Sequence, residues 1–152
     1  MIREFQREDF GAIRRYADDF WSEIQFAEFL GPINIDYFQR VFWSLYQEGK
    51  IKMWVFEKPG NGVVGGLCML ENINLFTGKR GLEELFWFVS APYRNSSCSI
   101  RLIKEMEKFA LTNSYDYITI YHMDKPMPEK LKKFYESQKY TPAQWQYIKK
   151  IK

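Results

Sequence analysis

Two rhythms of apolar and polar residues follow one another along the chain and mark its predicted elements. Apolar residues recur at helical spacing in some segments, whereas others alternate with a period of two or form short apolar runs typical of strands. The predicted helices are 7–24, 36–48, 98–113 and 128–138, and the predicted strands are 1–5, 50–58, 63–73, 82–91, 116–123 and 143–151.

This order of elements predicts one α/β (α+β) domain over residues 1–152. The strand 82–91, the helix 98–113 and the strand 116–123 should form a right-handed parallel crossover. The remaining strands read as hairpins or a meander, and 143–151 should lie antiparallel to a neighbour. We therefore expect a mixed, mostly antiparallel sheet with a central parallel pair, flanked by about four helices. Asp9 is the expected N-cap of the first helix.

Composition narrows the class of protein only moderately. The net charge of +3 fits an anionic ligand or an ordinary surface equally well. Cys68 and Cys98 are not a closely spaced pair and His122 is the single histidine, so we expect no metal site. No apolar run is long enough to span a bilayer, and residues 1–10 lack the apolar core of a signal peptide. We expect a cytoplasmic protein with free thiols and no membrane partner.

A glycine pattern at residues 60–65, GNGVVG, matches the fingerprint of dinucleotide-binding loops. That fingerprint requires a helix to begin directly after the glycines, because the helix N-terminus holds the phosphates. Here an apolar run without helical period follows. We therefore interpret the glycines as part of a β-hairpin and reject the nucleotide site.

The polar turn RNSSCS, residues 94–99, lies between a buried strand and a helix. Backbone N–H groups at a helix start lack intrahelical partners and favour an anion, and Arg94 adds donors suited to phosphate oxygens. Ser96, Ser97 and Ser99 add hydroxyl groups. Serine is also a common helix cap, so these residues alone leave phosphate binding and simple capping both open.

At this turn the chain resembles the GNAT family of acetyl-CoA-dependent N-acyltransferases, over nearly its whole length. In that family a strand ending in Val leads into a loop of pattern [R/Q]-x-x-G-x-[G/A], whose amides hold the CoA pyrophosphate. Val89 and Arg94 match, whereas Ser97 and Ser99 replace the glycines. The resemblance implies acetyl-CoA as co-substrate, bound by main-chain groups of the strand end and by the turn. The implied cofactor-binding residues are Phe88, Val89, Arg94, Asn95, Ser96, Ser97, Cys98 and Ser99.

A second match is LKKFYESQKY, residues 131–140, which resembles the family's helix-turn-strand segment. Tyr135 falls on the frequent general acid, which protonates the departing thiolate, and Lys139 replaces a glycine. A tyrosine suits this role because its pKa near 10 keeps it protonated at neutral pH. A purely structural role for Tyr135, packed beside its neighbours on the helix, also stays open.

The family's general base is often a Glu on the strand before the turn, which here offers Glu83 and Glu84. Strand alternation sends them to opposite faces and places Glu83 on the face of Trp87 and Val89, which slightly favours Glu83. Both could equally be solvated charges at the strand end. His122 and Asp124 are weaker candidates.

The resemblance therefore implies direct transfer of an acetyl group from acetyl-CoA to a primary amine, without a metal. The acceptor could be a small molecule or a protein, and its site would be framed by the first helices, with Trp21, Phe26, Phe29 and Tyr37 nearby. The alternative is a catalytically inactive GNAT-fold protein that binds a protein partner, which the replaced glycines favour. Homodimerisation stays open. The basic residues of 125–133 and 147–152 are explained by a solvated surface, so we expect no nucleic-acid partner.

Overall fold

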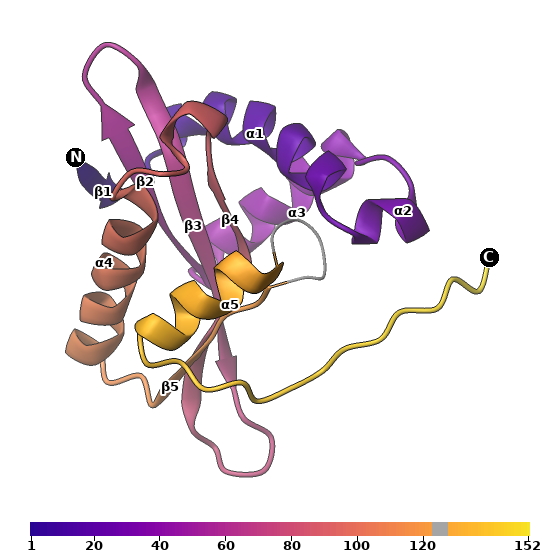
Figure 1. Cartoon of the computed structure of the whole chain (residues 1–152), viewed down its shortest axis with the longest axis vertical. Coiled ribbons are helices and arrows are strands. Elements are labelled where there is room, and N and C mark those ends of the chain that lie inside the picture. Colours follow the sequence, from indigo (N-terminus) through magenta and orange to yellow (C-terminus); the bar gives the residue numbers. More distant parts are fainter. Residues whose placement is uncertain (123–127) are drawn as a thin grey trace.

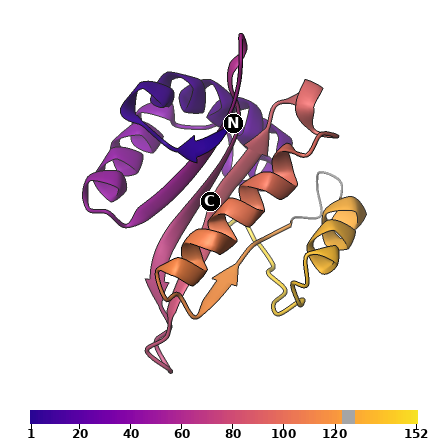
Figure 2. The same cartoon turned by 90° about the vertical axis from the view of Figure 1, so that its left-hand side faces the viewer.

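The computed structural model describes residues 1–122 and 128–152, and its framework is a mixed β-sheet with helices on both faces (Figure 1 and Figure 2). The described strands form one sheet in the order β1-β2-β3-β4-β5. Their bounds are β1 Ile2–Glu4, β2 Ile51–Lys58, β3 Gly62–Ile73, β4 Arg80–Val89 and β5 Tyr117–Thr119. The helices are α1 Phe10–Glu23, α2 Phe26–Leu30, α3 Ile35–Gln47, α4 Cys98–Thr112 and α5 Pro128–Ser137, with 3-10 turns at Arg7–Asp9 and Ala91–Tyr93.

Strand directions confirm the predicted fold class. β1 to β4 pair antiparallel with their neighbours, whereas β4 and β5 pair in parallel. The helix α4 connects the parallel pair, as the strand-helix-strand pattern predicts. The glycines of residues 60–65 lie in the turn between β2 and β3 and at the start of β3, so their predicted place in a β-hairpin is confirmed.

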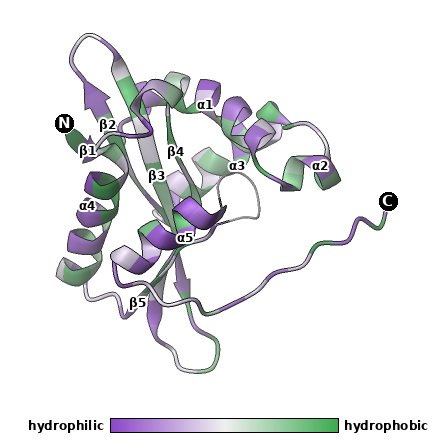
Figure 3. Cartoon of the chain, viewed as in Figure 1, coloured by the Kyte–Doolittle hydropathy of each residue, from purple (hydrophilic) through white to green (hydrophobic). Residues whose placement is uncertain are grey.

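Two clusters of buried side chains lie on the two faces of the sheet, because successive residues of a strand point to opposite sides. Met53 and Val55 pack with residues of α1 and α3, whereas Trp54 between them packs with α4. Figure 3 shows α4 with hydrophobic and hydrophilic residues in alternating bands, as expected of a helix with one buried face. Leu102 and Met106 are fully buried on that face. The sheet is thus covered by α1 to α3 on one side and by α4 on the other (Figure 2).

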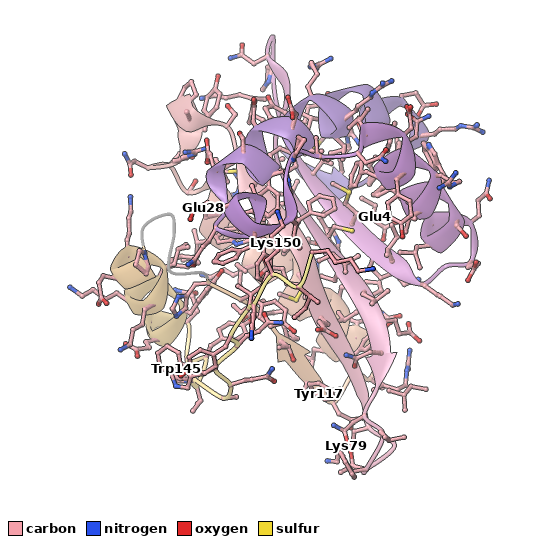
Figure 4. All side chains as sticks on the ribbon, turned by 90° about the vertical axis from the view of Figure 1, so that its right-hand side faces the viewer. Glu4, Glu28, Lys79, Tyr117, Trp145 and Lys150 are labelled. Carbon is pink, nitrogen blue, oxygen red and sulfur yellow. The ribbon has the colours of Figure 1, made fainter. Side chains whose placement is uncertain are left out.

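The predicted strand 143–151 is wrong, because residues 141–152 form no regular element. The segment leaves the end of α5 and runs away from the sheet (Figure 1). Figure 4 labels Trp145 and Lys150 along it. The exposed fractions are 78% for Trp145 and 92% for Tyr147. Alternation marks a sequence that could line a sheet, but a strand forms only where a neighbouring strand accepts its backbone hydrogen bonds.

The predicted capping role of Asp9 is also wrong in its chemistry. Asp9 directly precedes α1, but its side chain makes no cap hydrogen bond. Its carboxylate instead accepts from both terminal nitrogens of Arg3, at 2.7 and 2.9 Å, and from the backbone N–H of Gln6. Asp9 is buried, and this ion pair joins the first strand to the first helix.

The short helix α2 was not predicted, because a five-residue segment gives too little periodicity.

Gly65 on β3 allows the first residue of α4 to approach the sheet closely. A Cβ atom at this position would lie 2.8 Å from the sulfur of Cys98 and 3.2 Å from the backbone oxygen of Phe88. Cys98 is fully buried, so its side chain has no room to move away. The glycine therefore fixes how tightly the helix start packs on β3, and through it the position of the polar turn that precedes α4.

We expect Gly65→Ala to lower the free energy of unfolding by about 1–3 kcal/mol, because the added methyl group overpacks this contact. Denaturant unfolding followed by circular dichroism measures the change. Gly11→Ala is the matched control: it adds the same methyl group to α1, where no atom lies within 4 Å. That control should be neutral or stabilising, because Ala is a better helix former than Gly. Equal stability of Gly65→Ala and wild type would contradict the close packing.

Candidate functional site

The candidate site begins where the two parallel strands separate. β4 and β5 pair through Gly81–Tyr117, Leu82–Ile118 and Glu83–Thr119, and β5 ends there. β4 continues to Val89. In the described part of the chain no strand pairs with this second half of β4 on that side. The result is a fork in the sheet, with main-chain groups of β4 on one branch.

A cleft of about 750 Å³ occupies this fork. Its size lies in the range of small-molecule sites. Its walls come from α1, the second half of β4, the turn before α4, the chain after β5, and α5. The lining residues are Tyr16, Asp19, Phe20, Glu23, Ile24, Glu84, Trp87, Phe88, Val89, Ser90, Ala91, Pro92, Arg94, Asn95, Ser96, Ser99, Ile100, Tyr121, His122, Lys130, Leu131 and Phe134. The cleft thus combines an apolar floor with charged residues from several elements.

A β-bulge in β4 decides which glutamate faces the cleft. Glu84 pairs with Met69 and Phe86 pairs with Cys68, so Leu85 is an extra residue on this strand. Beyond the bulge the alternation is shifted by one position. Glu84 therefore lies on the face of Trp87 and Val89, and lines the cleft with them. The predicted placement of Glu83 on the face of Trp87 and Val89, which assumed unbroken alternation, is therefore wrong.

Glu84 lies at the fork itself. One oxygen of its carboxyl group accepts a hydrogen bond of 2.9 Å from the backbone N–H of Tyr121, which follows β5. Burial raises the pKa of Glu84 to about 8, and this hydrogen bond offsets only part of that effect. A carboxyl group with such a pKa can gain or lose a proton near neutral pH, as a general acid or base requires.

Glu83 lies outside the cleft lining and is held by hydrogen bonds on the other face of β4. Its carboxylate accepts from the side-chain amide of Asn72 at 2.8 Å and from the hydroxyl of Tyr121. These contacts tie β4 to β3 and to the chain after β5. Glu83 is thus hydrogen-bonded to two side chains outside the cleft lining, whereas Glu84 lines the cleft.

The polar turn contributes Arg94, Asn95, Ser96 and Ser99 to the cleft lining. The side chain of Arg94 is anchored at the strand end, because its Nε donates to the backbone oxygen of Val89 at 3.0 Å. The hydroxyl of Ser96 accepts from the N–H of Cys98 at 3.2 Å, whereas Ser97, the N-cap residue of α4, makes no cap hydrogen bond with its side chain.

Ser97 and Cys98, two of the residues that the resemblance assigns to the cofactor, do not line the cleft. Burial raises the pKa of the Cys98 thiol to about 11, so the side chain is inert. Ser97 has φ of −71°, an ordinary conformation for any residue. Replacement of the family's glycine here therefore creates no backbone strain. Phe88 and Val89 line the cleft, as the resemblance implies.

Tyr135 lies on α5 behind the cleft wall, and only 6% of it is exposed. Its hydroxyl donates to the backbone oxygen of Tyr121 at 2.8 Å. Burial, followed by the nearby Glu84, raises the pKa of Tyr135 above its ordinary value. The main chain of Tyr121 therefore joins the two candidates, because its N–H contacts Glu84 and its carbonyl oxygen contacts Tyr135.

The aromatic residues expected near an acceptor, Trp21, Phe26, Phe29 and Tyr37, do not line the cleft. Trp21, for example, donates from its indole nitrogen to the backbone oxygen of Gly31. The residues that α1 does contribute are Tyr16, Asp19, Phe20 and Glu23. His122 lines the cleft, whereas Asp124 lies outside the described residues.

The sequence-based prediction missed the charged residues of α1 and Lys130 of α5. Asp19 and Glu23 are spaced four residues apart and so share one face of α1. That spacing was a signal, but a polar helix face is ordinarily solvated, and only the tertiary structure turns it toward a cleft.

Other kinds of site find no support in residues 1–122 and 128–152. No group of three or more His, Cys, Asp or Glu side chains there could hold a metal ion. Among the same residues, no helix is both long and apolar enough to cross a membrane.

Solved structures with a similar fold include acetyltransferases. The sequence matches no family model and no curated protein. A GNAT family acetyltransferase of Staphylococcus aureus has a TM-score of 0.69 and 13% identity, with 99% of this chain and 98% of that chain covered. A ribosomal-protein-alanine N-acetyltransferase of Brucella melitensis has a TM-score of 0.65 and 18% identity, covering 97% and 96%. AAC(6')-Iy, in complex with the bisubstrate analogue CoA-S-monomethyl-acetylneamine, has a TM-score of 0.78 and 11% identity, covering 100% and 97%.

These similarities extend over nearly the full length of both chains and show that the protein has the GNAT fold. The fold predicted from the sequence resemblance is therefore confirmed. At identities of this size the similarity concerns the fold alone, so activity and substrates have to be argued from the residues of the cleft.

The raised pKa of Glu84 predicts a pH-dependent effect on stability. The folded state holds this proton up to about pH 8, whereas an unfolded glutamic acid loses it near its ordinary pKa of 4.5. Between these values the folded state binds more protons, so the contribution of Glu84 to the free energy of unfolding decreases as pH rises. Relative to wild type, Glu84→Gln should become more stable by about 1 kcal/mol or more between pH 5 and pH 8.5.

Denaturant unfolding at both pH values measures this difference, and the matched control is Glu83→Gln, which removes the neighbouring carboxylate outside the cleft. A stability difference between Glu84→Gln and wild type that does not change with pH would mean that the Glu84 pKa is not raised.

Proposed function

We propose that this protein is an N-acyltransferase that moves an acetyl group from acetyl-CoA directly to a primary amine. The observation that supports this most is the fork between β4 and β5. Among the described residues it leaves the end of β4 without a strand partner on the β5 side, beside a turn with arginine, asparagine and serine side chains. An extended chain with amide groups can pair with such a strand end, and a diphosphate suits the turn. Pantetheine and the diphosphate of CoA offer this combination.

The residues of the cleft fit the proton transfers that this reaction needs. An amine is mostly protonated at neutral pH and must lose a proton before it attacks a thioester. In the proposal, Glu84 accepts that proton, and its pKa of about 8 is close to the value a general base needs near neutral pH. The nitrogen forms its bond to the acyl carbon, and the carbon–sulfur bond breaks with its electron pair moving to sulfur.

In the same proposal Tyr135 supplies the proton to the departing thiolate, and the second proton that the nitrogen loses as the amide forms restores the Tyr135 hydroxyl. Its raised pKa keeps the hydroxyl protonated throughout the neutral range. Its proton points to the carbonyl oxygen of Tyr121 and would have to turn toward the cleft to act. The proposed base and the proposed acid both contact the main chain of Tyr121: its N–H donates to Glu84, and its carbonyl oxygen accepts from Tyr135. These contacts keep both side chains near the fork. Orientation of the two substrates would supply much of the rate.

A second candidate function is partner binding without chemistry. The observation that favours it is the state of Arg94, whose terminal nitrogen donates to both carboxylate oxygens of Glu23. The side chain best suited to a diphosphate therefore already has an anionic partner. For the acyltransferase, we propose no more about the acceptor than that it carries a primary amine, on a small molecule or on a protein.

Titration with acetyl-CoA by calorimetry tests the proposal. We expect micromolar binding in wild type and at least about tenfold weaker binding in Arg94→Ala, because a charge-assisted contact to a phosphate oxygen is lost. Arg14→Ala is the matched control, since Arg14 is an exposed arginine of α1 outside the cleft. Absence of binding at millimolar acetyl-CoA would reject the acyltransferase and favour the partner-binding function.

Tyr135→Phe tests the acid separately. Once an accepting amine is found, we expect the variant to lower kcat by about 100-fold with little change in the affinity for CoA, because only the proton donor is removed. Tyr140→Phe is the matched control. It removes a hydroxyl that binds Glu107, and its ring lies 6.3 Å from that of Tyr135. An unchanged kcat in Tyr135→Phe would remove Tyr135 from the mechanism.

A further inference from the structure

Two polar contacts connect the turn before α4 to other cleft-lining residues. On one side the guanidinium of Arg94 donates from one terminal nitrogen to the two carboxylate oxygens of Glu23 on α1, at 2.8 Å each. On the other side Lys130 of α5 donates to the side-chain oxygen of Asn95 at 2.8 Å. All four residues line the cleft. The turn is therefore connected to α1 through its own cation, Arg94, and to α5 through the cation Lys130.

The guanidinium of Arg94 is positioned independently of Glu23. Its Nε donates to the backbone oxygen of Val89, which leaves the terminal nitrogens to bind other groups. A carboxylate and a phosphate present similar pairs of oxygen atoms to such a donor. Glu23 therefore occupies the place on Arg94 that a phosphate group would take. Both side chains are partly exposed, at 35% and 42%, and ion pairs of this kind contribute little to stability.

Lys130 provides a second cation on the opposite wall. Its contact to Asn95 joins an ammonium group to a neutral amide, which is a weaker partner than an anion. Lys130 lies in the first turn of α5, next to the cleft-lining Leu131. Arg94 and Lys130 thus flank the turn from both sides, and an anion at the turn would lie between two positive charges.

We propose that the diphosphate of the co-substrate binds between Arg94 and Lys130, and that it does so by displacing Glu23 from Arg94 and Asn95 from Lys130. This inference rests on the proposed function for the identity of the ligand, although the anion site itself does not depend on catalysis. Glu23 is then a competitor of the diphosphate, and Lys130 is a binding residue outside the turn. Serine side chains keep a diphosphate farther from the backbone amides of the turn than glycine would, and the charges of Arg94 and Lys130 offset the weaker contact to those amides.

If Glu23 competes with the diphosphate, removal of its charge should improve binding. With Glu23→Gln the competing charge is lost, and CoA should bind about two- to fivefold more tightly, in line with the small free energy of an exposed ion pair. Asp19→Asn is the matched control. It removes the same charge from the same cleft-lining face of α1, one turn away. A gain caused only by the general electrostatic field would be similar in both variants.

Lys130→Gln should weaken CoA binding by at least about fivefold, as expected for loss of a charge-assisted hydrogen bond. Lys133→Gln is its control, an exposed lysine of the same helix that does not line the cleft. Each variant should be titrated with CoA, with pantetheine, which lacks the diphosphate, and with inorganic diphosphate. Glu23→Gln and Lys130→Gln should change the affinity for CoA and diphosphate in opposite directions and leave pantetheine unchanged.

The outcomes separate this inference from the proposed function. If wild type binds CoA but Glu23→Gln binds it no better than Asp19→Asn, Glu23 is not a competitor and the inference is wrong. Weaker CoA binding in Glu23→Gln would also overturn it, because Glu23 would then position Arg94. If CoA and pantetheine do not bind while inorganic diphosphate binds with the predicted dependence on Glu23 and Lys130, the anion site stands and the acyltransferase proposal fails.

Discussion

The early end of pairing between β4 and β5 is the constraint on which the candidate site depends. Adjacent strands normally satisfy one another's backbone groups, and a strand that loses its neighbour needs other partners. Side chains take over that role at the fork. Glu84 accepts from the N–H of Tyr121, and Arg94 donates to the carbonyl oxygen of Val89. The residues that satisfy these backbone groups at the fork, Glu84 and Arg94, therefore also line the cleft.

The sequence predicted those parts of the fold in which local pattern and tertiary structure agree. The helix 98–113 has one apolar face and a sheet to pack on, and the strand-helix-strand order admits only one handedness. The position of the cleft follows from that crossover. The predicted strand 143–151 had the right alternation, but alternation specifies only which side chains could be buried together. It does not supply a neighbouring strand, and Tyr147 remains almost fully exposed.

The choice between Glu83 and Glu84 shows why the site was harder to predict than the fold. From the bulge onward, residues 85–89 are apolar on both faces, so the shift in alternation leaves no mark on their hydrophobic pattern. The extra residue nevertheless shifts the alternation, so that positions before the bulge share a face with different positions after it than an unbroken strand would give. Asp19 and Glu23 were missed for a different reason. Their polar pattern is that of a solvated helix face, and only the packing of α1 beside β4 directs them to the cleft.

The residues that replace the family's glycines differ in backbone conformation. Lys139 keeps the left-handed conformation of the glycine it replaces, with φ of 66°, at a cost of roughly 1–2 kcal/mol. The N–H of Tyr140 still bonds to the carbonyl oxygen of Tyr135, so the end of α5 is preserved. Ser97 has an ordinary φ, and Ser99 is not among the described residues with positive φ. The turn therefore keeps its backbone without glycine, and the serines alter only the space beside it. Since Ser99 lines the cleft and Ser97 does not, Ser99 is the replacement that bears on ligand binding.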